Sequence, residues 1–261
     1  MRRIVTRLLS ITMLLCFVAI AAAQENVKAL LPVDRKDEWW QKRFAEKNEQ
    51  LKKGDAELLL VGDSITNGWD NDSAKEAREK YLDGWKWVNL GFSGDQTQHV
   101  LWRLENAPMD AVKPKAIMLM IGTNNIGNKQ SPEDTVLGIA AIVKKLKDLY
   151  PNAKILVLNV FPRDEKPDGR LRVEVDKINS LLPKTLGKQK NVTLFSINDK
   201  FLDKDGTLPK SVMPDSLHPQ KDGYLIWGET VQPKLKSMIE QKSTSSSYVK
   251  STTRRAARRA R

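Results

Sequence analysis

The sequence predicts a single α/β domain built around a parallel β-sheet. Apolar stretches of strand length recur five times along the chain, and the longest are apolar at nearly every position. Strands covered by helices on both faces have this composition, whereas strands with one face in water alternate apolar and polar residues. Segments with a helical period separate the stretches, with no internal repeat or linker between them. This alternation of strand and helix is typical of a parallel sheet between helices.

The predicted elements follow one another in a regular order. We expect strands over residues 57–61, 87–90, 116–121, 154–160 and 192–197. We expect helices over residues 37–53, 96–105, 131–150, 170–186 and 220–241. The third helix has the clearest start, because Ser131 is a suitable N-cap and Pro132 suits the first helical position. Ligands of such sheets bind at the carboxyl ends of the strands, so residues that follow the strands are candidates for a site.

The N-terminal segment 1–23 has the pattern of a secretory signal peptide. It combines three arginines, an apolar stretch over 8–20 and three alanines before Gln24. The stretch is short for a membrane span, which leaves a retained anchor as the weaker alternative. The sequence therefore predicts a secreted or periplasmic protein, and leaves Sec and twin-arginine export open. The single cysteine, Cys16, lies in this segment, so the mature chain would contain no disulfide.

The net charge of +12 is concentrated at the two ends of the chain. Three arginines in 1–23 and seven Lys or Arg in 242–261 leave a balance of only +2 over 24–241. The domain over 24–241 is therefore not a basic nucleic-acid platform. Segment 242–261 holds no acid and few apolar residues, so we expect a disordered tail. Two alternatives stay open for it: weak contact with a polyanion or membrane surface, and no fixed partner.

Four short polar segments follow the predicted strands or lie in a late loop. They are Gly62-Asp63-Ser64, Asn89-Leu90-Gly91-Phe92-Ser93-Gly94-Asp95, Gly122-Thr123-Asn124-Asn125 and Asp215-Ser216-Leu217-His218-Pro219. Parallel strands bring such segments to one edge of the sheet. Together they hold a nucleophile, oxyanion donors and an acid–base pair, which is the set of groups that a serine esterase needs.

Ser64, His218 and Asp215 are the candidate catalytic residues. Ser64 lies where the first strand turns into a helix, whose free N–H groups favour a developing anion. Asp215 precedes His218 by three residues, so one short turn can hold both side chains. Each has an ordinary alternative, since serine is a frequent N-cap and His218 could be a surface histidine. The other histidine, His99, lies in a helical pattern and is expected to pack.

The candidate oxyanion hole consists of the Ser64 and Gly94 N–H groups and the Asn124 side-chain amide. Glycine lets the backbone approach a substrate closely, and asparagine donates without carrying a charge. Both are also common turn residues. Asp63 and Asp95 are interpreted as hydrogen-bond acceptors that brace the loops. No cofactor or metal is expected, because the segments offer one histidine, no cysteine and no calcium-loop pattern.

These segments resemble those of the SGNH or GDSL hydrolase family. The α/β-hydrolase elbow is absent, because Thr66 stands where its second glycine would be. The four blocks are Gly62-Asp63-Ser64 followed by Ile65 where the family has leucine, then Gly94, Asn124, and Asp215 with His218. The run over 94–104, with the segments 113–115, 122–125 and 162–167, resembles the catalytic subunits of platelet-activating factor acetylhydrolases. The resemblance implies a flavodoxin-like three-layer α/β/α sandwich with a five-stranded parallel sheet, no metal and hydrolysis of short acyl esters.

The expected function is therefore that of a secreted serine esterase that removes short acyl groups, acetyl groups above all. Acetylated carbohydrate is the favoured substrate, since an exported enzyme meets polymers more often than cytosolic phospholipids. Ile65, Thr123 and Leu217 adjoin the site residues in sequence and are expected to line the acyl pocket. Two alternatives remain: a lipid acetylhydrolase, and a non-catalytic scaffold that docks anionic polymers through the tail. The sequence leaves the oligomeric state open, including a homodimer.

Overall fold

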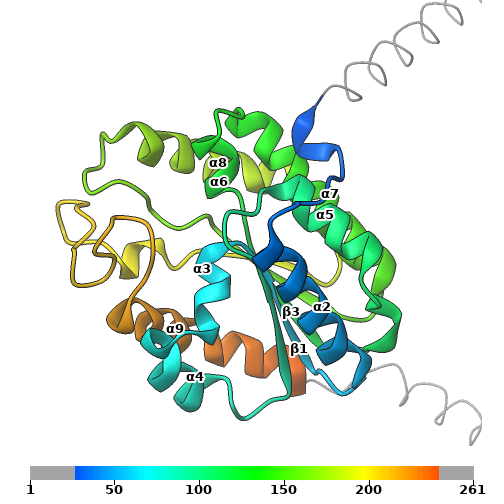
Figure 1. Ribbon diagram of the computed structural model, residues 1–261. Coiled ribbons are helices and arrows are strands. Elements are labelled where there is room, and N and C mark those ends of the chain that lie inside the picture. Colours follow the sequence, from blue (N-terminus) through cyan, green and yellow to red (C-terminus); the bar gives the residue numbers. More distant parts are fainter. Residues whose placement is uncertain (1–26, 241–261) are drawn as a thin grey trace, which may run out of the picture.

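A five-stranded parallel sheet forms the centre of the computed structural model, which describes residues 27–240 (Figure 1). The strands are β1 (Leu58–Gly62), β2 (Trp87–Gly91), β3 (Ala116–Met120), β4 (Lys154–Leu158) and β5 (Val192–Phe195). Their spatial order is β2-β1-β3-β4-β5, and every neighbouring pair is parallel. This is the flavodoxin-like order, so the predicted fold class is confirmed. The expected signal peptide and tail lie outside the described residues.

Helices cover both faces of the sheet. The longer ones are α2 (Glu38–Lys52), α5 (Thr97–Asn106), α7 (Pro132–Leu149), α8 (Arg170–Leu186) and α9 (Lys221–Glu240). Alternate strand residues such as Leu59 and Ile117 join one buried cluster with α2, α5, α7 and α8. Their neighbours Leu58 and Met118 join the other cluster with α9, Ile65 and Ala77. Because successive side chains of a strand point to opposite faces, these two clusters make the sheet the middle layer of three.

The short helices escape prediction because four to seven residues show no clear period. They are α3 (Ser64–Asn67), α4 (Lys75–Tyr81) and α6 (Thr123–Gly127). Five 3₁₀ turns complete the described part: η1 (Lys28–Leu30), η2 (Gly68–Asp70), η3 (Asp72–Ala74), η4 (Met109–Ala111) and η5 (Asn198–Lys200). Helix α4 is polar in sequence, and α9 holds it through a close approach. A Cβ at Gly228 would lie 2.5 Å from Cδ2 of Tyr81, so only glycine admits the ring there.

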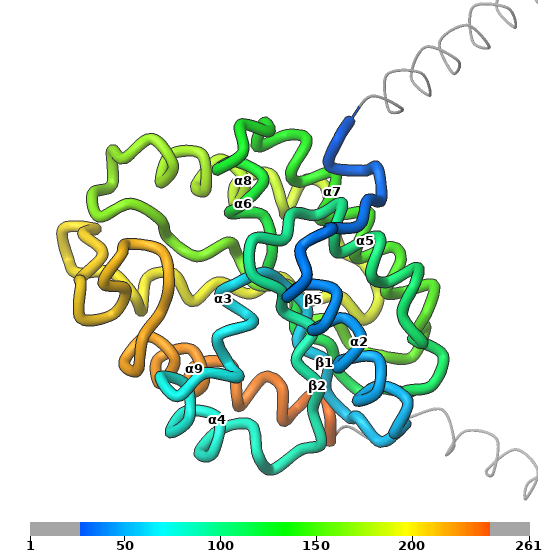
Figure 2. Tube along the Cα trace, viewed as in Figure 1, coloured from blue at the N-terminus to red at the C-terminus, as the bar shows by residue number. Residues whose placement is uncertain are grey.

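Three strands end at the same edge of the sheet and continue directly into candidate site segments. Strand β1 leads to α3, β2 to the loop that holds Gly94, and β3 to α6. The chain before α2 runs past α5 and reaches the same edge, as Figures 1 and 2 both show. Within residues 27–240, no helix has the length and apolarity that a bilayer crossing requires.

Candidate active site

Three predicted residues lie in one hydrogen-bonded chain at this edge. The Oγ atom of Ser64 lies 2.9 Å from Nε2 of His218, although 154 residues separate them in sequence. The Nδ1 atom of the same ring lies 2.6 Å from Oδ2 of Asp215. An ionised carboxylate only accepts hydrogen bonds, so Nδ1 carries the proton and the Nε2 lone pair faces the serine hydroxyl. In this arrangement the imidazole can accept the proton of Ser64.

The loop that carries the acid and the base is a tight turn closed by Asp215 itself. Oδ1 of Asp215 accepts hydrogen bonds from the backbone N–H groups of Leu217 at 3.1 Å and His218 at 2.7 Å. Ser216 adopts the left-handed conformation with φ of 57°, which short polar residues tolerate in turns. Partial burial opposes ionisation of Asp215, but the hydrogen bonds from His218 outweigh it and lower the pKa of the carboxyl. The carboxylate is thus ionised and fixed beside the ring.

Ser64 is the first residue of α3, and the buried Asp63 caps this helix. Oδ1 of Asp63 accepts the N–H of Ile65 at 3.0 Å. Such a cap orients the first turn of the helix, in which Ser64 lies. The side chain of Asp63 is fully buried, and its Oδ2 has no hydrogen-bond partner among the described residues. Asp63 therefore acts as the loop brace that the sequence suggested, with one carboxyl oxygen left unsatisfied.

The stability of the protein should depend on pH through Asp63. Burial raises the pKa of this carboxyl to about 7. The hydrogen bond from the Ile65 N–H favours the carboxylate and lowers the pKa, but by less than burial raises it. Between pH 4 and 7 the folded protein therefore binds a proton that the unfolded chain has released. The contribution of this group to the free energy of unfolding is fully present below about pH 4 and is lost as the pH rises to 7. We expect Asp63→Asn to remove a slope of up to about 1.4 kcal/mol per pH unit between pH 4 and 7.

Urea unfolding of Asp63→Asn and the wild type at several pH values measures this difference. Asp72→Asn serves as the control, because that side chain is exposed. Identical pH profiles for Asp63→Asn and the wild type would contradict the burial argument.

The candidate oxyanion donors Gly94 and Asn124 lie on the loop after β2 and in the first turn of α6. Gly94 is exposed and has φ of 77°, a conformation that favours glycine. Nδ2 of Asn124 donates to the carbonyl of Asp95 at 3.0 Å, which ties α6 to the Gly94 loop. An amide nitrogen has two hydrogens, so the second remains to be donated to a substrate. Together with the N–H of Ser64, these groups can stabilise a negative oxygen.

A buried polar network that sequence reasoning missed lies behind these two segments. Asn125 is fully buried and donates from Nδ2 to Thr97 Oγ1 and to Gln130 Oε1, both at 2.9 Å. Its Oδ1 accepts the N–H of Thr97 at 3.1 Å, and Gln130 donates in turn to Gln96. Buried and satisfied networks of this kind hold loops in one arrangement. The only signal in the sequence was the polar character of these residues beside Gly94 and Asn124.

The buried side chain of Asp95 anchors the Gly94 loop to the protein interior. Its fully buried carboxylate accepts hydrogen bonds from Nε1 of Trp40 at 2.8 Å and from Nε of Arg103 at 2.9 Å. Arg103 also donates to the carbonyls of Leu90 and Gly62, at the ends of two strands. The site loops are thus fixed to the sheet by a buried ion pair. Neither Trp40 nor Arg103 could be assigned this role from the sequence, because no local pattern connects Trp40 with Asp95, 55 residues away, or Arg103 with Gly62, 41 residues away.

His99 lies outside the catalytic chain, as expected for a packing residue. Its Nδ1 accepts the N–H of Gln96 at 3.0 Å in a capping box at the start of α5. Burial, with nearby Arg35 and Arg103, lowers the pKa of this ring to about 4. The ring is therefore neutral at pH 7.

The residues expected to form an acyl pocket differ in their exposure. Ile65 packs in the core cluster on the α9 side, and Thr123 is fully buried. Nη1 of Arg163 donates to the carbonyl and Oγ1 of Thr123 at 3.0 and 3.3 Å. Leu217 is half-buried and lies beside His218 in the turn. Of the three, Leu217 alone is partly exposed, whereas Ile65 and Thr123 pack inside the protein.

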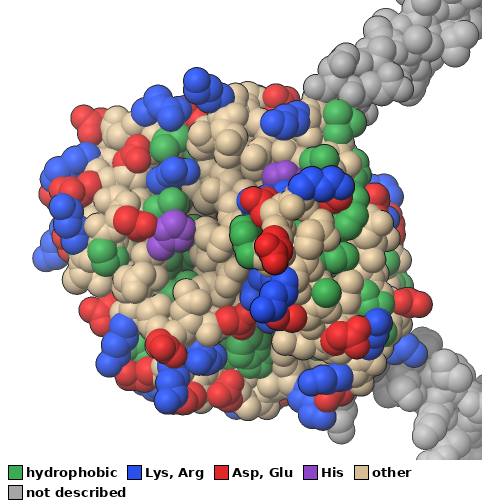
Figure 3. Space-filling model, viewed as in Figure 1, with side chains coloured by type: hydrophobic (Ala, Val, Ile, Leu, Met, Phe, Trp, Pro, Cys, Tyr) green, Lys and Arg blue, Asp and Glu red, His purple; other side chains and the backbone are tan. Residues whose placement is uncertain are grey.

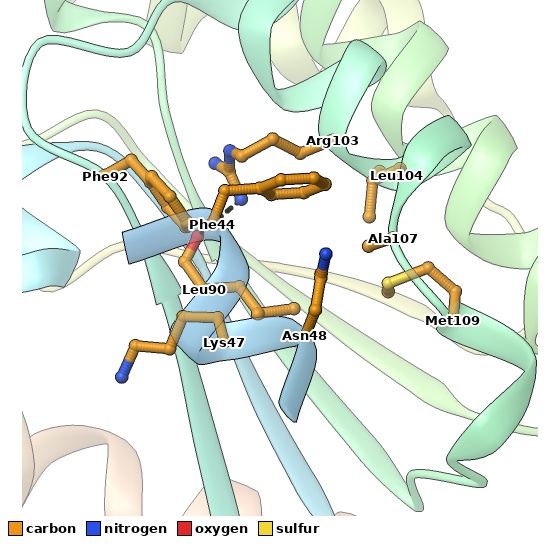
Figure 4. A pocket seen from close by; sticks show the side chains of 9 residues that line it. All are labelled: Phe44, Lys47, Asn48, Leu90, Phe92, Arg103, Leu104, Ala107 and Met109. Atoms are coloured by element: carbon orange, nitrogen blue, oxygen red, sulfur yellow. Dashed lines mark hydrogen bonds between the residues drawn. The ribbon is translucent and has the colours of Figure 1, made fainter. Parts of the chain in front are cut away.

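A small cavity lies away from this site, between α2, β2 and α5 (Figure 4). Phe44, Leu90, Phe92 and Leu104 are among its lining residues. Its free space is about 10 Å³, which is enough for roughly one water molecule. None of the predicted site residues lines it. The cavity is too small for an ester.

The surface around the site carries charges of both signs. Figure 3 shows acidic and basic side chains interspersed over this face, with no continuous basic area. Within residues 27–240, no group of three or more His, Cys, Asp or Glu side chains is arranged to hold a metal ion. The chemistry described above rests on the side chains and backbone groups already named.

Comparison with known proteins gives one consistent family. The model of the GDSL-like lipase/acylhydrolase family matches residues 60–226. Platelet-activating factor acetylhydrolase IB subunit alpha2 of Rattus norvegicus is 36% identical over 206 residues, which cover 79% of this chain and 84% of the relative. The Homo sapiens protein of the same name is 35% identical over the same shares.

Solved structures agree with the fold. A GDSL-like lipase of Bacteroides thetaiotaomicron is 19% identical, with a TM-score of 0.62 over 75% of this chain and 97% of that chain. An acetylxylan esterase of Geobacillus stearothermophilus is 17% identical, with a TM-score of 0.53 over 72% of this chain and 95% of that chain. At these identities the likeness extends to the fold alone.

Proposed function

This chain belongs to the GDSL-like lipase/acylhydrolase family, and from that membership we propose that it is an exported serine esterase that removes short acyl groups, acetyl in particular. The observation that carries the proposal is the chain of contacts from Ser64 through His218 to Asp215, at 2.9 and 2.6 Å. A non-catalytic binding protein would have no need of a serine, a histidine and a carboxylate in this arrangement.

The proposed reaction has two steps. Oγ of Ser64 attacks the acyl carbonyl carbon while Nε2 of His218 takes the hydroxyl proton, and the carbonyl oxygen becomes an oxyanion. The N–H groups of Ser64 and Gly94 and the amide of Asn124 stabilise this charge. As the C–O bond to the alcohol breaks, His218 returns the proton to the leaving oxygen. Water then attacks the acyl-enzyme by the same sequence, and Asp215 holds the imidazole in one tautomer throughout.

We propose acetylated carbohydrate as the substrate class, in keeping with export and with the acetylxylan esterase of the same fold. A second candidate is an acetylated lipid, because the relatives at 35–36% identity are named platelet-activating factor acetylhydrolases. Release of acetate from acetylated xylo-oligosaccharides and from platelet-activating factor, assayed side by side with 4-nitrophenyl acetate, tests both. Turnover of 4-nitrophenyl acetate alone would support the esterase and neither substrate class. No turnover of any ester would contradict the proposal.

The enzyme should prefer acetyl esters to butyryl and longer esters. Leu217 lies directly beside His218, and a branched side chain at that position leaves little room for a long acyl group. We expect kcat/KM to fall by about tenfold from acetyl to butyryl 4-nitrophenyl esters, equivalent to about 1.4 kcal/mol. Leu217→Ala should relieve the restriction. Equal rates on acetyl and octanoyl esters in the wild type would show that no such pocket limits the acyl chain.

Export and the role of the tail remain proposals, because residues 1–23 and 242–261 lie outside the described residues. Cleavage before Gln24, measured by the mass of the mature protein, would test the signal peptide. We further propose weak contact of segment 242–261 with a polyanion or membrane surface.

A further inference from the structure

We propose that Trp39 and Arg35 form a binding surface for the sugar ring of an acylated carbohydrate, next to the oxyanion loop. This proposal rests on the esterase function proposed above and specifies its substrate side. Both residues precede the region that the family model matches, which begins at residue 60. We call this surface the Trp39–Arg35 platform.

Arg35 adjoins the oxyanion loop directly. Its Nη1 donates to the carbonyl of Ser93 at 2.6 Å and lies 3.6 Å from Oδ1 of Asp95. A Cβ added at Gly94 would lie 2.9 Å from the same Nη1 atom, so the guanidinium covers this glycine closely. Gly94 itself is exposed. A substrate whose carbonyl oxygen reaches the Gly94 N–H would therefore come within reach of Arg35.

Trp39 continues this surface away from the site. The guanidinium carbon of Arg35 lies 5.2 Å from the centroid of the Trp39 ring, which places the cation over one face of the indole. The residue nevertheless remains 43% exposed, and it is the one aromatic side chain among the exposed large hydrophobic residues of the described part of the chain. Its neighbour Trp40 is fully buried and bonded to Asp95. The start of α2 is therefore fixed, and Trp39 is presented on a rigid element.

Polar groups of the platform are available beside the ring. Nε of Arg35 donates to Oδ2 of Asp37 at 3.0 Å, whereas its Nη2 has no hydrogen-bond partner among residues 27–240. The Asp37 side chain is 43% exposed and can accept further hydrogen bonds. A sugar ring has an apolar face of C–H groups and a rim of hydroxyls, so it matches an aromatic ring flanked by a donor and an acceptor.

A lipid surface fits the platform less well. Exposed Leu31 and Val33 lie in the same segment and would suit a lipid. However, the two cations next to Trp39 in sequence, Arg35 and Lys36, are paired with acids. Lys36 donates to Asp34 at 2.6 Å, and Arg35 donates to Asp37. Attachment to anionic membranes depends on unpaired basic residues, so the paired charges favour an uncharged polar ligand.

The test compares one polymer-like substrate with one small ester. Trp39→Ala, Trp39→Phe and the wild type are assayed on acetylated xylo-oligosaccharides and on 4-nitrophenyl acetate, which has no sugar. We expect Trp39→Ala to raise KM for the oligosaccharides and lower kcat/KM about tenfold, a typical effect of losing an aromatic contact. Trp39→Phe should retain most of the activity, and 4-nitrophenyl acetate turnover should be unchanged in both variants. Val173→Ala, which removes an exposed apolar side chain from α8, is the matched control.

Several outcomes would overturn the platform while leaving the esterase intact. One is an equal loss on both substrates, which would mean that Trp39 supports the oxyanion loop. Another is no loss on either substrate. Weaker sedimentation of Trp39→Ala with phosphatidylcholine vesicles, with oligosaccharide turnover unchanged, would identify a lipid-contacting surface instead. A wild type that cleaves 4-nitrophenyl acetate but no acetylated oligosaccharide would remove the carbohydrate proposal and the platform together. A wild type that cleaves neither ester would contradict the proposed function itself.

Discussion

Ser64→Ala is expected to lower kcat by about three or more orders of magnitude, because the nucleophile and its base act as a unit. The fold should persist, since Oγ of Ser64 bonds only to His218 among the described residues. His218→Ala should cost about as much, and the double variant little more than either alone. Steady-state hydrolysis of 4-nitrophenyl acetate measures all three, with circular dichroism as the control for folding.

If Ser64 and His218 acted independently, the double variant would lose far more activity than either single variant. If the losses of the single variants multiplied in the double variant, Ser64 and His218 would contribute through separate routes. More than about a tenth of wild-type turnover in Ser64→Ala would contradict a nucleophilic role, because loss of a true nucleophile leaves only the binding and oxyanion contributions.

Asn124→Ala should give the second largest effect, a loss of about 10²–10³ in kcat with little change in KM. The amide donates to the oxyanion only when charge develops in the transition state, so its removal leaves ground-state binding intact. Part of the loss in kcat would come from the lost hydrogen bond between Nδ2 of Asn124 and the carbonyl of Asp95, at 3.0 Å, which positions the Gly94 loop. The shorter side chain of Asn124→Ser cannot reach both the oxyanion and the Asp95 carbonyl, so its kcat should be close to that of the alanine variant.

Asn128→Ala is the matched control for this change. Asn128 is an exposed asparagine at the end of the same helix, and its Nδ2 donates to the Asn124 carbonyl at 2.8 Å. It tests the loss of an amide from α6 without loss of an oxyanion donor. Equal kcat values for the Asn124 and Asn128 variants would contradict the oxyanion assignment.

The sheet and the long helices of this protein could be predicted because their signals are local. Five apolar runs became five strands, and the Ser131-Pro132 start became the N-terminus of α7, with Ser131 Oγ accepting the N–H of Asp134. The predicted strands over 116–121, 154–160 and 192–197 end earlier in the structure. Ile121, Val160 and Ile197 are buried all the same, because the chain turns toward the site while still inside the core.

The meeting of the candidate groups at one edge could also be predicted from the sequence, because parallel strands bring their carboxyl ends together. The Asp-x-x-His spacing corresponds to one turn in which Asp215 Oδ1 binds two backbone N–H groups. The supports behind the site could not be found. Trp40, Arg103 and Asn125 act through partners 55, 8 and 28 residues away, respectively, and nothing in a linear pattern selects those partners.

The exposure of individual side chains could not be predicted from the sequence either. Ile65, Thr123 and Leu217 each adjoin a site residue, yet only Leu217 is partly exposed. Adjacency along the chain does not fix the direction of a side chain at the start of a helix, where successive residues point to different faces. Trp39 and Trp40 are another example, because these neighbours of the same residue type on one helix are 43% exposed and fully buried, respectively.

Covalent trapping of the nucleophile tests the central claim most directly. A 4-nitrophenyl phosphonate ester reacts with an activated serine: the Oγ–P bond forms, 4-nitrophenolate leaves and the serine proton passes to the histidine. Peptide mass spectrometry then locates the adduct. We expect one phosphonyl group per chain, on Ser64, appearing at the rate at which esterase activity disappears. Loss of activity with the label on another residue, or an unlabelled Ser64 in fully inhibited enzyme, would contradict this account.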